Sequence, residues 1–311
     1  MGKAVRWRSS GAGGKLLARD LGGVGRMGVA VFFHADLGGG ELAGGELAGG
    51  ELAGADLAGA DLAGAEPAGG ELAGAEVAGG ELVGAEVVLG GSEGRHAAVV
   101  RRIGTGERIR LTDGRGSWAE GPVVLAGKSG VTVAVDERGT TAAPDPRVVV
   151  VQALPKGERA ELAVEMLTEV GADVIVPWNA ERSQFRANPE RVEKTLAKWR
   201  AWAFEAGKQS RRTWFAEVTP IASTAEVARL LAGAALPVVL HEEATTPLAS
   251  LQPPTTGDIV LVIGPEGGIA PTELAAFTTY ADPVRLGDTV LRTSTAGVAA
   301  AAALLAQSRW R

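Results

Sequence analysis

Residues 260–274 read VLVIGPEGGIAPTEL, an apolar run that ends abruptly in Gly-Pro-Glu-Gly-Gly. The apolar run is typical of a strand buried on both faces, and Pro271 favours a helix start after the loop. Gly264, Gly267 and Gly268 leave room for a group to approach the backbone, and glycine also permits positive φ. The segment therefore predicts a strand, a glycine loop and a helix, with the loop as either a ligand site or only a tight turn.

The same alternation of strand and helix patterns continues on both sides of this segment, from Arg147 to the C-terminus. Asn188 followed by Pro189 marks one helix start, and Ser223 with Glu226 forms the pattern of a capping box at another. We expect an α/β domain over residues 147–311, with a parallel sheet covered by helices on both faces. The expected strands are 147–154, 172–178, 213–218, 237–243, 258–264 and 283–287, and the expected helices are 158–171, 189–207, 223–234, 271–280 and 294–307.

A second, smaller domain is expected over residues 27–146. Residues 27–37 resemble a first strand, and residues 106–125 and 129–138 alternate apolar and polar side chains around Asp113-Gly114, a hairpin dipeptide. Residues 92–102 are a short helix candidate with a basic face, and residues 140–146 form a proline-rich linker. These features predict a small antiparallel barrel joined to the α/β domain.

Residues 38–86 interrupt this barrel with a five-residue repeat in which an acid recurs from Glu41 to Glu86. The repeat resembles the pentapeptide pattern, in which each five residues form one side of a square β-helix. The alternative is a glycine-rich acidic insertion that stays mobile. Residues 1–26 are expected to be a basic, disordered leader, or Met27 is the true start.

The composition restricts the possible functions. The chain has 311 residues and no cysteine, which excludes disulfides and thiolate metal sites, and its three histidines make a histidine metal cluster improbable. The net charge of −6 includes ten acids in residues 38–91, and residues 1–26 sum to +5, so the rest is near −1 (−6 + 10 − 5). Nucleic-acid binding must therefore rest on local basic clusters. We expect no membrane segment, no metal and a cytoplasmic protein.

Ligands of such sheets bind at the carboxyl ends of the strands. Three segments meet this condition: residues 240–243, 263–268 and 285–297. The spacing of a dinucleotide fingerprint is absent, and no Gly-Lys-Ser/Thr follows the glycines as in a phosphate loop. Glu266 in the loop would repel a phosphate and tolerate a cation.

An ordered set of motifs resembles one known family. LHEE (240–243), IGPEGG (263–268) and RLGDTVLRTSTA (285–296) are similar to the SPOUT methyltransferases, and FFHADL, GRHAAVVRR and AGKQSRR narrow the resemblance to their ribosomal small-subunit RNA uridine-N3 methyltransferases. The resemblance covers residues 27–37 and about 87–311. It implies a PUA-like RNA-binding barrel, a SPOUT domain with a trefoil knot, S-adenosylmethionine as cofactor, 16S ribosomal RNA of the small subunit as substrate, and a homodimer.

The resemblance also implies site residues. Arg292 is the candidate catalytic residue, because a cation stabilises negative charge developing on the base; its alternative role is a salt bridge at a helix start. Glu266 either tolerates the sulfonium or accepts amide hydrogen bonds, and Thr293, Ser294 and Thr295 are candidate helix caps. The expected cofactor-binding residues are Leu240, His241, Glu242, Ile263, Gly264, Pro265, Glu266, Gly267, Gly268, Leu286, Gly287, Leu291, Thr295 and Ala296.

RNA contacts are expected from two local groups of side chains, since arginine suits phosphates and base edges. His96 is expected to support its helix rather than touch RNA. Two alternative functions stay open, namely a SPOUT methyltransferase acting on the 2′-hydroxyl of another RNA, and a non-catalytic RNA-binding or repeat scaffold. The candidate RNA-binding residues are Arg95, Arg101 and Arg102 on the barrel, and Arg182, Gln209, Arg211 and Arg212 on the α/β domain.

Overall fold

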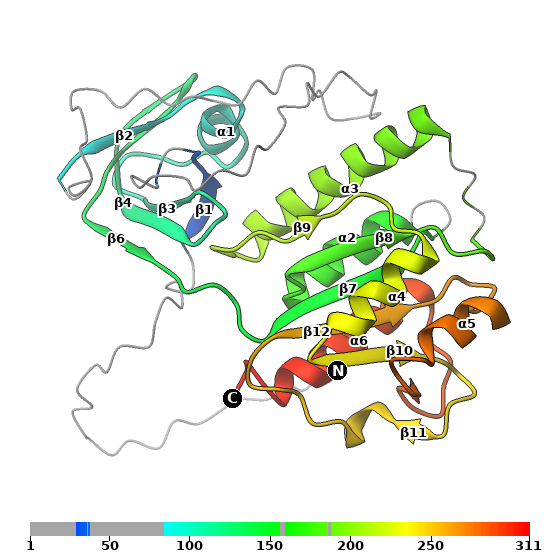
Figure 1. Cartoon of the computed structure of the whole chain (residues 1–311). Coiled ribbons are helices and arrows are strands. Elements are labelled where there is room, and N and C mark those ends of the chain that lie inside the picture. The colour runs from blue at the N-terminus through cyan, green and yellow to red at the C-terminus, as the bar shows by residue number, and fades with distance from the viewer. Residues whose placement is uncertain (1–28, 36, 38–83, 156–158, 184, 186–187) are drawn as a thin grey trace, which may run out of the picture.

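The computed structural model describes residues 29–35, 37, 84–155, 159–183, 185 and 188–311. It consists of a small barrel and a larger α/β domain (Figure 1). The predicted leader, Met27 and most of the predicted insertion lie outside the described residues. Glu86, which we placed in the insertion, is instead the first residue of strand β2 (Glu86–Leu89) and pairs with Ala134, because Val87 and Leu89 are buried in the barrel.

The barrel is a six-stranded sheet in the order β1-β3-β4-β5-β2, with β6 paired to β4. Its pairings are antiparallel except that β1 runs parallel to β3, and the predicted hairpin at Asp113-Gly114 joins β3 to β4. The predicted helix at 92–102 is α1 followed by a π-helical turn. The bounds are β1 (Ala30–Phe33), α1 (Gly91–Arg95), the π-helical turn His96–Val100, β3 (Arg108–Thr112), β4 (Ser117–Gly127), β5 (Gly130–Ala134) and β6 (Glu137–Thr140).

Within the described residues, the α/β domain has seven parallel strands in the order β11-β13-β10-β12-β7-β8-β9. The parallel sheet is confirmed, but the strands predicted over 237–243 and 283–287 end earlier, at Leu240 and Arg285, and the sequence pattern did not reveal the short edge strand β11. Its strands are β7 (Arg147–Ala153), β8 (Val174–Trp178), β9 (Glu217–Val218), β10 (Leu236–Leu240), β11 (Thr246–Pro247), β12 (Asp258–Ile263) and β13 (Pro283–Arg285). Its helices are α2 (Arg159–Val170), α3 (Pro189–Gln209), α4 (Thr224–Gly233), α5 (Pro271–Phe277) and α6 (Thr293–Ala306), with a 3₁₀ turn at Leu248–Ser250.

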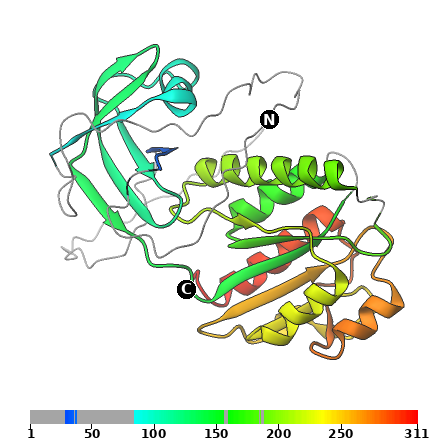
Figure 2. The ribbon, with the colours of Figure 1, turned by 45° about the horizontal axis from the view of Figure 1, so that its top comes forward.

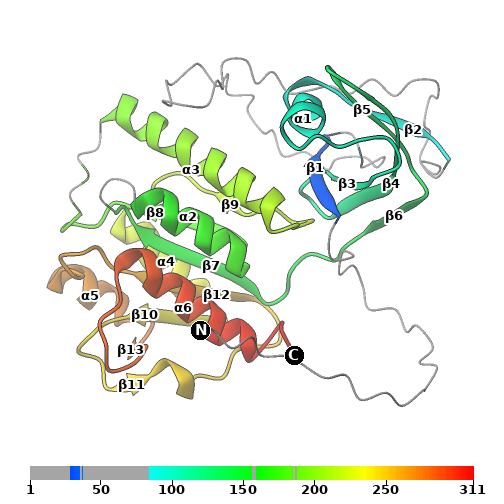
Figure 3. The same cartoon turned by 180° about the vertical axis from the view of Figure 1, so that it is seen from behind.

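Strand β7 shows how the sheet is buried on both faces. Val148 and Val150 pack in the core formed with α2, α3 and α6, whereas Val149 and Val151 pack in the core formed with α4 and α5. Figure 3 shows α2, α3 and α6 on one side of the sheet, and Figure 1 shows α4 and α5 on the other. The continuous apolar strands are thus explained by two separate helical layers.

Three predicted helix ends are confirmed, whereas the helix predicted over 271–280 ends earlier, at Phe277. Oδ1 of Asn188 accepts a hydrogen bond from the backbone N–H of Arg191 at 2.8 Å, and Ser223 forms its capping box with Glu226. Helix α2 ends at Val170, and Gly171 follows it with φ +106°.

Residues 213–215 do not extend β9, contrary to the strand predicted over 213–218. Their backbone groups pair with the barrel instead: the N–H of Gly116 donates to Thr213 O at 2.8 Å, and the N–H of Phe215 donates to Gly114 O at 2.9 Å. The ring of Phe215 packs against those of Phe33 and Phe204. This segment therefore docks the α/β domain on the barrel, which lies beside the end of α3 (Figure 2).

Candidate active site and RNA surface

The three candidate strand ends lie next to one another. Strand β10 pairs with β12 on one side and with β13 on the other, all parallel, so their carboxyl ends share one edge of the sheet. Leu240 is opposite Val284, and the N–H of His241 donates to Val284 O at 2.9 Å. Three segments far apart in the sequence thus lie side by side at one edge of the sheet, as the strand pattern predicts.

The glycine loop is accounted for largely by contacts within the protein. A Cβ on Gly264 would lie 2.8 Å from Cγ1 of Ile269, which folds back over it, and a Cβ on Gly267 would lie 3.3 Å from Cβ of Arg182. Gly268 has φ +73° and closes a turn in which its N–H donates to Pro265 O at 2.9 Å. The expectation that all three glycines serve the approach of a ligand is therefore too broad, because packing and turn geometry also require them.

Glu266 does not fix this loop by accepting amide hydrogen bonds from the described residues. Its carboxylate is half-exposed and lies 3.8 Å from Nη1 of Arg159. The amide-binding carboxylate is Glu273 of α5, which is 4% exposed. Glu273 accepts hydrogen bonds from the N–H groups of Ala270 and Glu181. Sequence reasoning missed this role, although a glutamate three residues after Ala270 matches the N3 position of a capping box.

The third segment, between β13 and α6, provides open space. Apart from the two chain neighbours of Gly287, no atom of the described residues lies within 4 Å of a Cβ built there, so the backbone is free to meet a flat group. Val290 and Leu291 are 82% and 40% exposed, and Leu286 packs against the core. Gly287 is exposed, so the space beside its backbone opens to solvent.

Arg292 lies at the N-cap of α6, where its carbonyl accepts hydrogen bonds from the N–H groups of Thr295 and Ala296. Among the described residues no ion pair or hydrogen bond engages its exposed guanidinium, so the alternative salt bridge is absent there. The predicted capping by Thr293, Ser294 or Thr295 is wrong: the helix begins at Thr293, and the hydroxyl of Thr295 donates to Arg292 O at 3.2 Å.

Arg182, which we expected at an RNA surface, follows β8, and its side chain contacts the glycine loop. Its Nη1 donates to Gly267 O at 3.1 Å, and a Cβ on Gly268 would lie 3.8 Å from both Arg182 Nη1 and Glu242 Oε1. The loop after β8 thus joins the three predicted segments at the site. Glu242 is exposed there, while His241 turns its Nδ1 to accept the N–H of Glu243.

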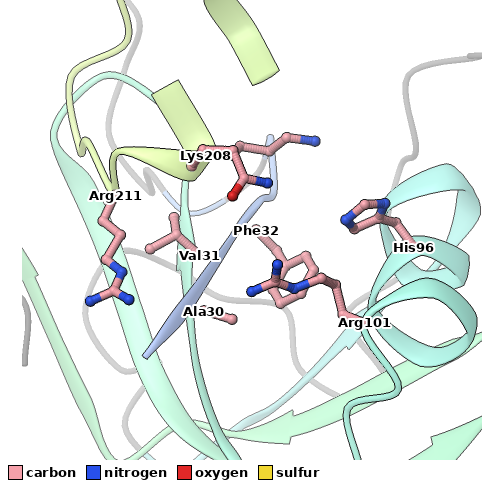
Figure 4. A pocket seen from close by; sticks show the side chains of 8 residues that line it. Ala30, Val31, Phe32, His96, Arg101, Lys208 and Arg211 are labelled. Carbon is pink, nitrogen blue, oxygen red and sulfur yellow. The ribbon is translucent and has the colours of Figure 1, made fainter. Parts of the chain in front are cut away.

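The other candidate RNA-binding residues separate into two kinds. Arg101, Gln209 and Arg211 line one pocket between the barrel and the end of α3 (Figure 4), and Arg95 and Arg102 are exposed on either side of Arg101 in the sequence. The His96 ring packs edge-on against Phe32 with centroids 6.3 Å apart, and it also lines this pocket.

Arg212 is not available to RNA. Its guanidinium donates to Thr168 O, Ala172 O and Trp214 O and pairs with Asp173 at 2.9 Å. Burial lowers the pKa of Arg212, and Asp173 opposes this effect. Its role is to hold α2, the start of β8 and the docking segment together.

The sequence predicts neither a membrane segment nor a metal site. Within the described ranges, no helix is long and apolar enough to cross a membrane, and no cluster of His, Asp and Glu side chains has the arrangement of a metal site.

Comparisons with known proteins agree with this arrangement. Residues 143–305 match the model of an RNA methyltransferase domain, and residues 89–136 match that of an RNA methyltransferase PUA domain. The chain is 47% identical over 230 residues to ribosomal RNA small subunit methyltransferase E of Mycobacterium bovis, covering 72% of this chain and 87% of the relative. The Bacillus subtilis protein of the same name is 28% identical over 230 residues, covering 70% of this chain and 89% of that one.

Solved structures are similar as well. Ribosomal RNA small subunit methyltransferase E from Neisseria gonorrhoeae, bound to S-adenosylmethionine, aligns with a TM-score of 0.62 and 28% identity over 72% of this chain and 92% of that chain. A Legionella pneumophila protein in complex with the same cofactor aligns with a TM-score of 0.65 and 28% identity over 74% and 95%. With its PUA barrel and α/β catalytic domain, the chain belongs to the RNA methyltransferase family.

Proposed function

We propose that this protein transfers a methyl group from S-adenosylmethionine to N3 of a uridine in 16S ribosomal RNA of the small subunit. The observation that carries the proposal is that the loops after β10, β12 and β13 lie at one edge of the sheet. The third of these loops ends at Arg292, whose guanidinium has no partner among the described residues. The relatives named for small-subunit methylation support the choice of RNA.

The residues present fit the cofactor. The backbone of Leu240, Ile263 and Gly264 would hold the adenine and ribose from one side, and Leu286, Gly287 and Leu291 from the other, with Gly287 giving the closest approach. Thr295 and Ala296, in the first turn of α6, would border the same place. Bound there, S-adenosylmethionine supplies an electrophilic methyl group on a positively charged sulfur. The cofactor found in the Neisseria relative supports this assignment.

The chain itself provides positioning and charge. The proton of uridine N3 would pass to water as the nitrogen becomes a nucleophile, so negative charge spreads over the base, and the methyl transfer would release S-adenosylhomocysteine. Arg292 would stabilise that charge, and the loops would align N3 with the methyl group for in-line displacement.

Three further features belong to the proposal. The segment 286–292 would thread with α6 to close a trefoil knot, in keeping with the packing of Gly297 against Ile263 and Leu167. The protein would act as a homodimer in the cytoplasm, and the exposed apolar side chains of Val290 and Leu291 are suited to a subunit interface.

The test is methylation of small subunits purified from cells that lack this protein. We expect S-adenosylmethionine to bind in calorimetry, and labelled methyl groups to map by mass spectrometry to one uracil base. A label on a ribose would replace the proposal by 2′-O methylation, and absence of cofactor binding would favour a non-catalytic scaffold.

A further inference from the structure

A pocket lies where the barrel meets the α/β domain, away from the strand-end loops. The barrel contributes Ala30, Val31, Phe32, His96 and Arg101, and the end of α3 contributes Lys208, Gln209 and Arg211. In Figure 4 the side chains of Arg101 and Arg211 lie on opposite sides of β1, with His96 beside Arg101. The pocket therefore exists only when the two domains are docked.

The cationic groups of this pocket are not equivalent. The ammonium of Lys208 is buried and paired, at 2.6 Å from Glu93 and 2.8 Å from Glu205. Arg101 and Arg211 form no ion pair with any residue in the part of the chain that the structure describes. The guanidinium groups of Arg101 and Arg211 thus line one pocket, and no carboxylate among the described residues pairs with them. Lys208 also lines the pocket, but its charge is already paired.

The backbone adopts a conformation that is costly for an arginine at Arg211, which lines the pocket, and at Arg102, which follows Arg101. Among the described residues, the non-glycine residues with positive φ are Arg102, at +55°, and Arg211, at +59°. Arg211 follows Ser210, the C-cap of α3, at the position where glycine is most common. Such strain in non-glycine residues clusters at ligand sites, where the side chain is needed despite the backbone.

We propose that this junction pocket binds a backbone phosphodiester of the substrate RNA between Arg101 and Arg211. The planar guanidinium forks of the two arginines match phosphate oxygens, and they come from different domains. The inference rests on the proposed function, since it assigns a second contact for the same RNA.

The location of the pocket adds a length requirement. Helix α3 has 21 residues, which corresponds to about 30 Å, and its C-terminal end lies at the barrel while its N-terminal end lies away from it (Figures 1 and 3). Arg182, whose side chain contacts the glycine loop, belongs to the segment that precedes α3. A contact at the junction therefore requires an extended or folded RNA and not an isolated nucleotide.

The experiment compares R101A, R211A and R211G with R229A, an arginine of α4 whose side chain is 77% exposed. Binding of a fluorescent 16S ribosomal RNA transcript is measured at several salt concentrations. We expect R101A and R211A to weaken binding and each to reduce the slope of log affinity against log salt by about one, whereas R229A stays like the wild type. Wild-type slopes in both R101A and R211A would overturn the proposal.

R211G separates binding from folding. Glycine relieves the positive φ, so we expect the melting temperature to hold or rise by about 2 °C while RNA affinity falls. R211G that retains full RNA affinity would overturn the phosphate contact. Because these measurements need no methyl transfer, they are distinct from the test of the proposed function, which fails if the wild type binds the cofactor but leaves uridine N3 unmodified.

Discussion

Nζ of Lys208 lies 2.6 Å from Oε1 of Glu93, and this contact joins α3 of the catalytic domain to α1 of the barrel. The other oxygen of Glu93 accepts the N–H of Phe33 in β1 at 3.2 Å. The side chains of Lys208 and Glu93 are only 6% and 13% exposed. One carboxylate thus ties together the first barrel strand, the barrel helix and the longest helix of the catalytic domain.

Breaking this pair should destabilise the docked protein. K208M leaves the carboxylate of Glu93 with little solvent and no cation, and we expect a loss of about 3 kcal/mol in the free energy of unfolding, measured by urea denaturation. E205Q is the matched control, because Glu205 is 57% exposed and its pair with Lys208 should contribute less than about 1 kcal/mol. Equal losses in K208M and E205Q would contradict the role of the buried pair.

The adjacent residues Arg211 and Arg212 should have opposite phenotypes. R212K keeps the charge but cannot replace the hydrogen bonds to Thr168 O, Ala172 O and Trp214 O, so we expect it to lose about 2 kcal/mol or more of unfolding free energy. R211A should keep its stability and lose RNA affinity. Thermal melting and RNA binding of the two variants decide the matter, and a stable R212K with weak RNA binding would restore Arg212 to the RNA surface.

Much of the fold is predictable from the sequence because periodicity reports burial directly. The continuous apolar runs of β7 and β12 indicate a sheet covered on both faces, and Asn188 and Ser223 mark helix starts through local hydrogen bonds. Residues 213–215 depart from the pattern: their side chains favour β structure, but their backbone groups form hydrogen bonds with the barrel rather than with β8. Local spacing carries no information about such a partner.

The candidate site is predictable only in outline. Strand ends and glycines indicate where a ligand binds, but the functions of Glu266 and Glu273 cannot be told apart without knowing which carboxylate is buried. Likewise, Arg211 and Arg212 are neighbours in sequence, but the turn after α3 directs Arg212 into the protein and Arg211 to the pocket. The sequence does not distinguish the two.

Two glycines at the strand ends should respond differently to alanine. In G264A the new methyl group would meet Ile269 at 2.8 Å, so stability should fall, and the second substitution I269A should restore part of it. In G287A the new methyl group would meet no described residue beyond its chain neighbours within 4 Å, so stability should hold while affinity for S-adenosylmethionine falls, measured by calorimetry. Undiminished cofactor affinity in G287A would place the cofactor elsewhere.

Glu165 should make the protein slightly less stable at neutral pH. Partial burial raises its pKa, and the neighbouring carboxylates Glu161 and Glu169 raise it further. Because the folded pKa is raised, the ionised form is disfavoured in the fold, so the penalty is absent below the ordinary pKa and complete above the raised one. E165Q should therefore stabilise the protein by a few tenths of a kcal/mol at pH 7 and by nothing near pH 3, measured by urea denaturation.

E161Q is the control for this pH effect. Glu161 lies in the first turn of α2, where a negative charge is favourable to the helix dipole, so its neutralisation should bring no comparable gain. Equal stabilisation by E165Q at pH 3 and pH 7 would contradict the electrostatic explanation.

Arg292 should act on the rate of methyl transfer more than on cofactor binding. Its backbone caps α6 through the carbonyl oxygen, which any residue provides, so R292A should fold normally. Loss of a cation beside the developing charge on the base predicts a fall in kcat of about 100-fold or more, with the Kd for S-adenosylmethionine nearly unchanged. R292K keeps a charge without the planar fork and should recover part of the rate. Single-turnover methylation of small subunits, with R229A as the control arginine, measures the effect. If R292A loses cofactor affinity in proportion to rate, Arg292 instead holds the cofactor, and the charge on the uracil must be stabilised by another group.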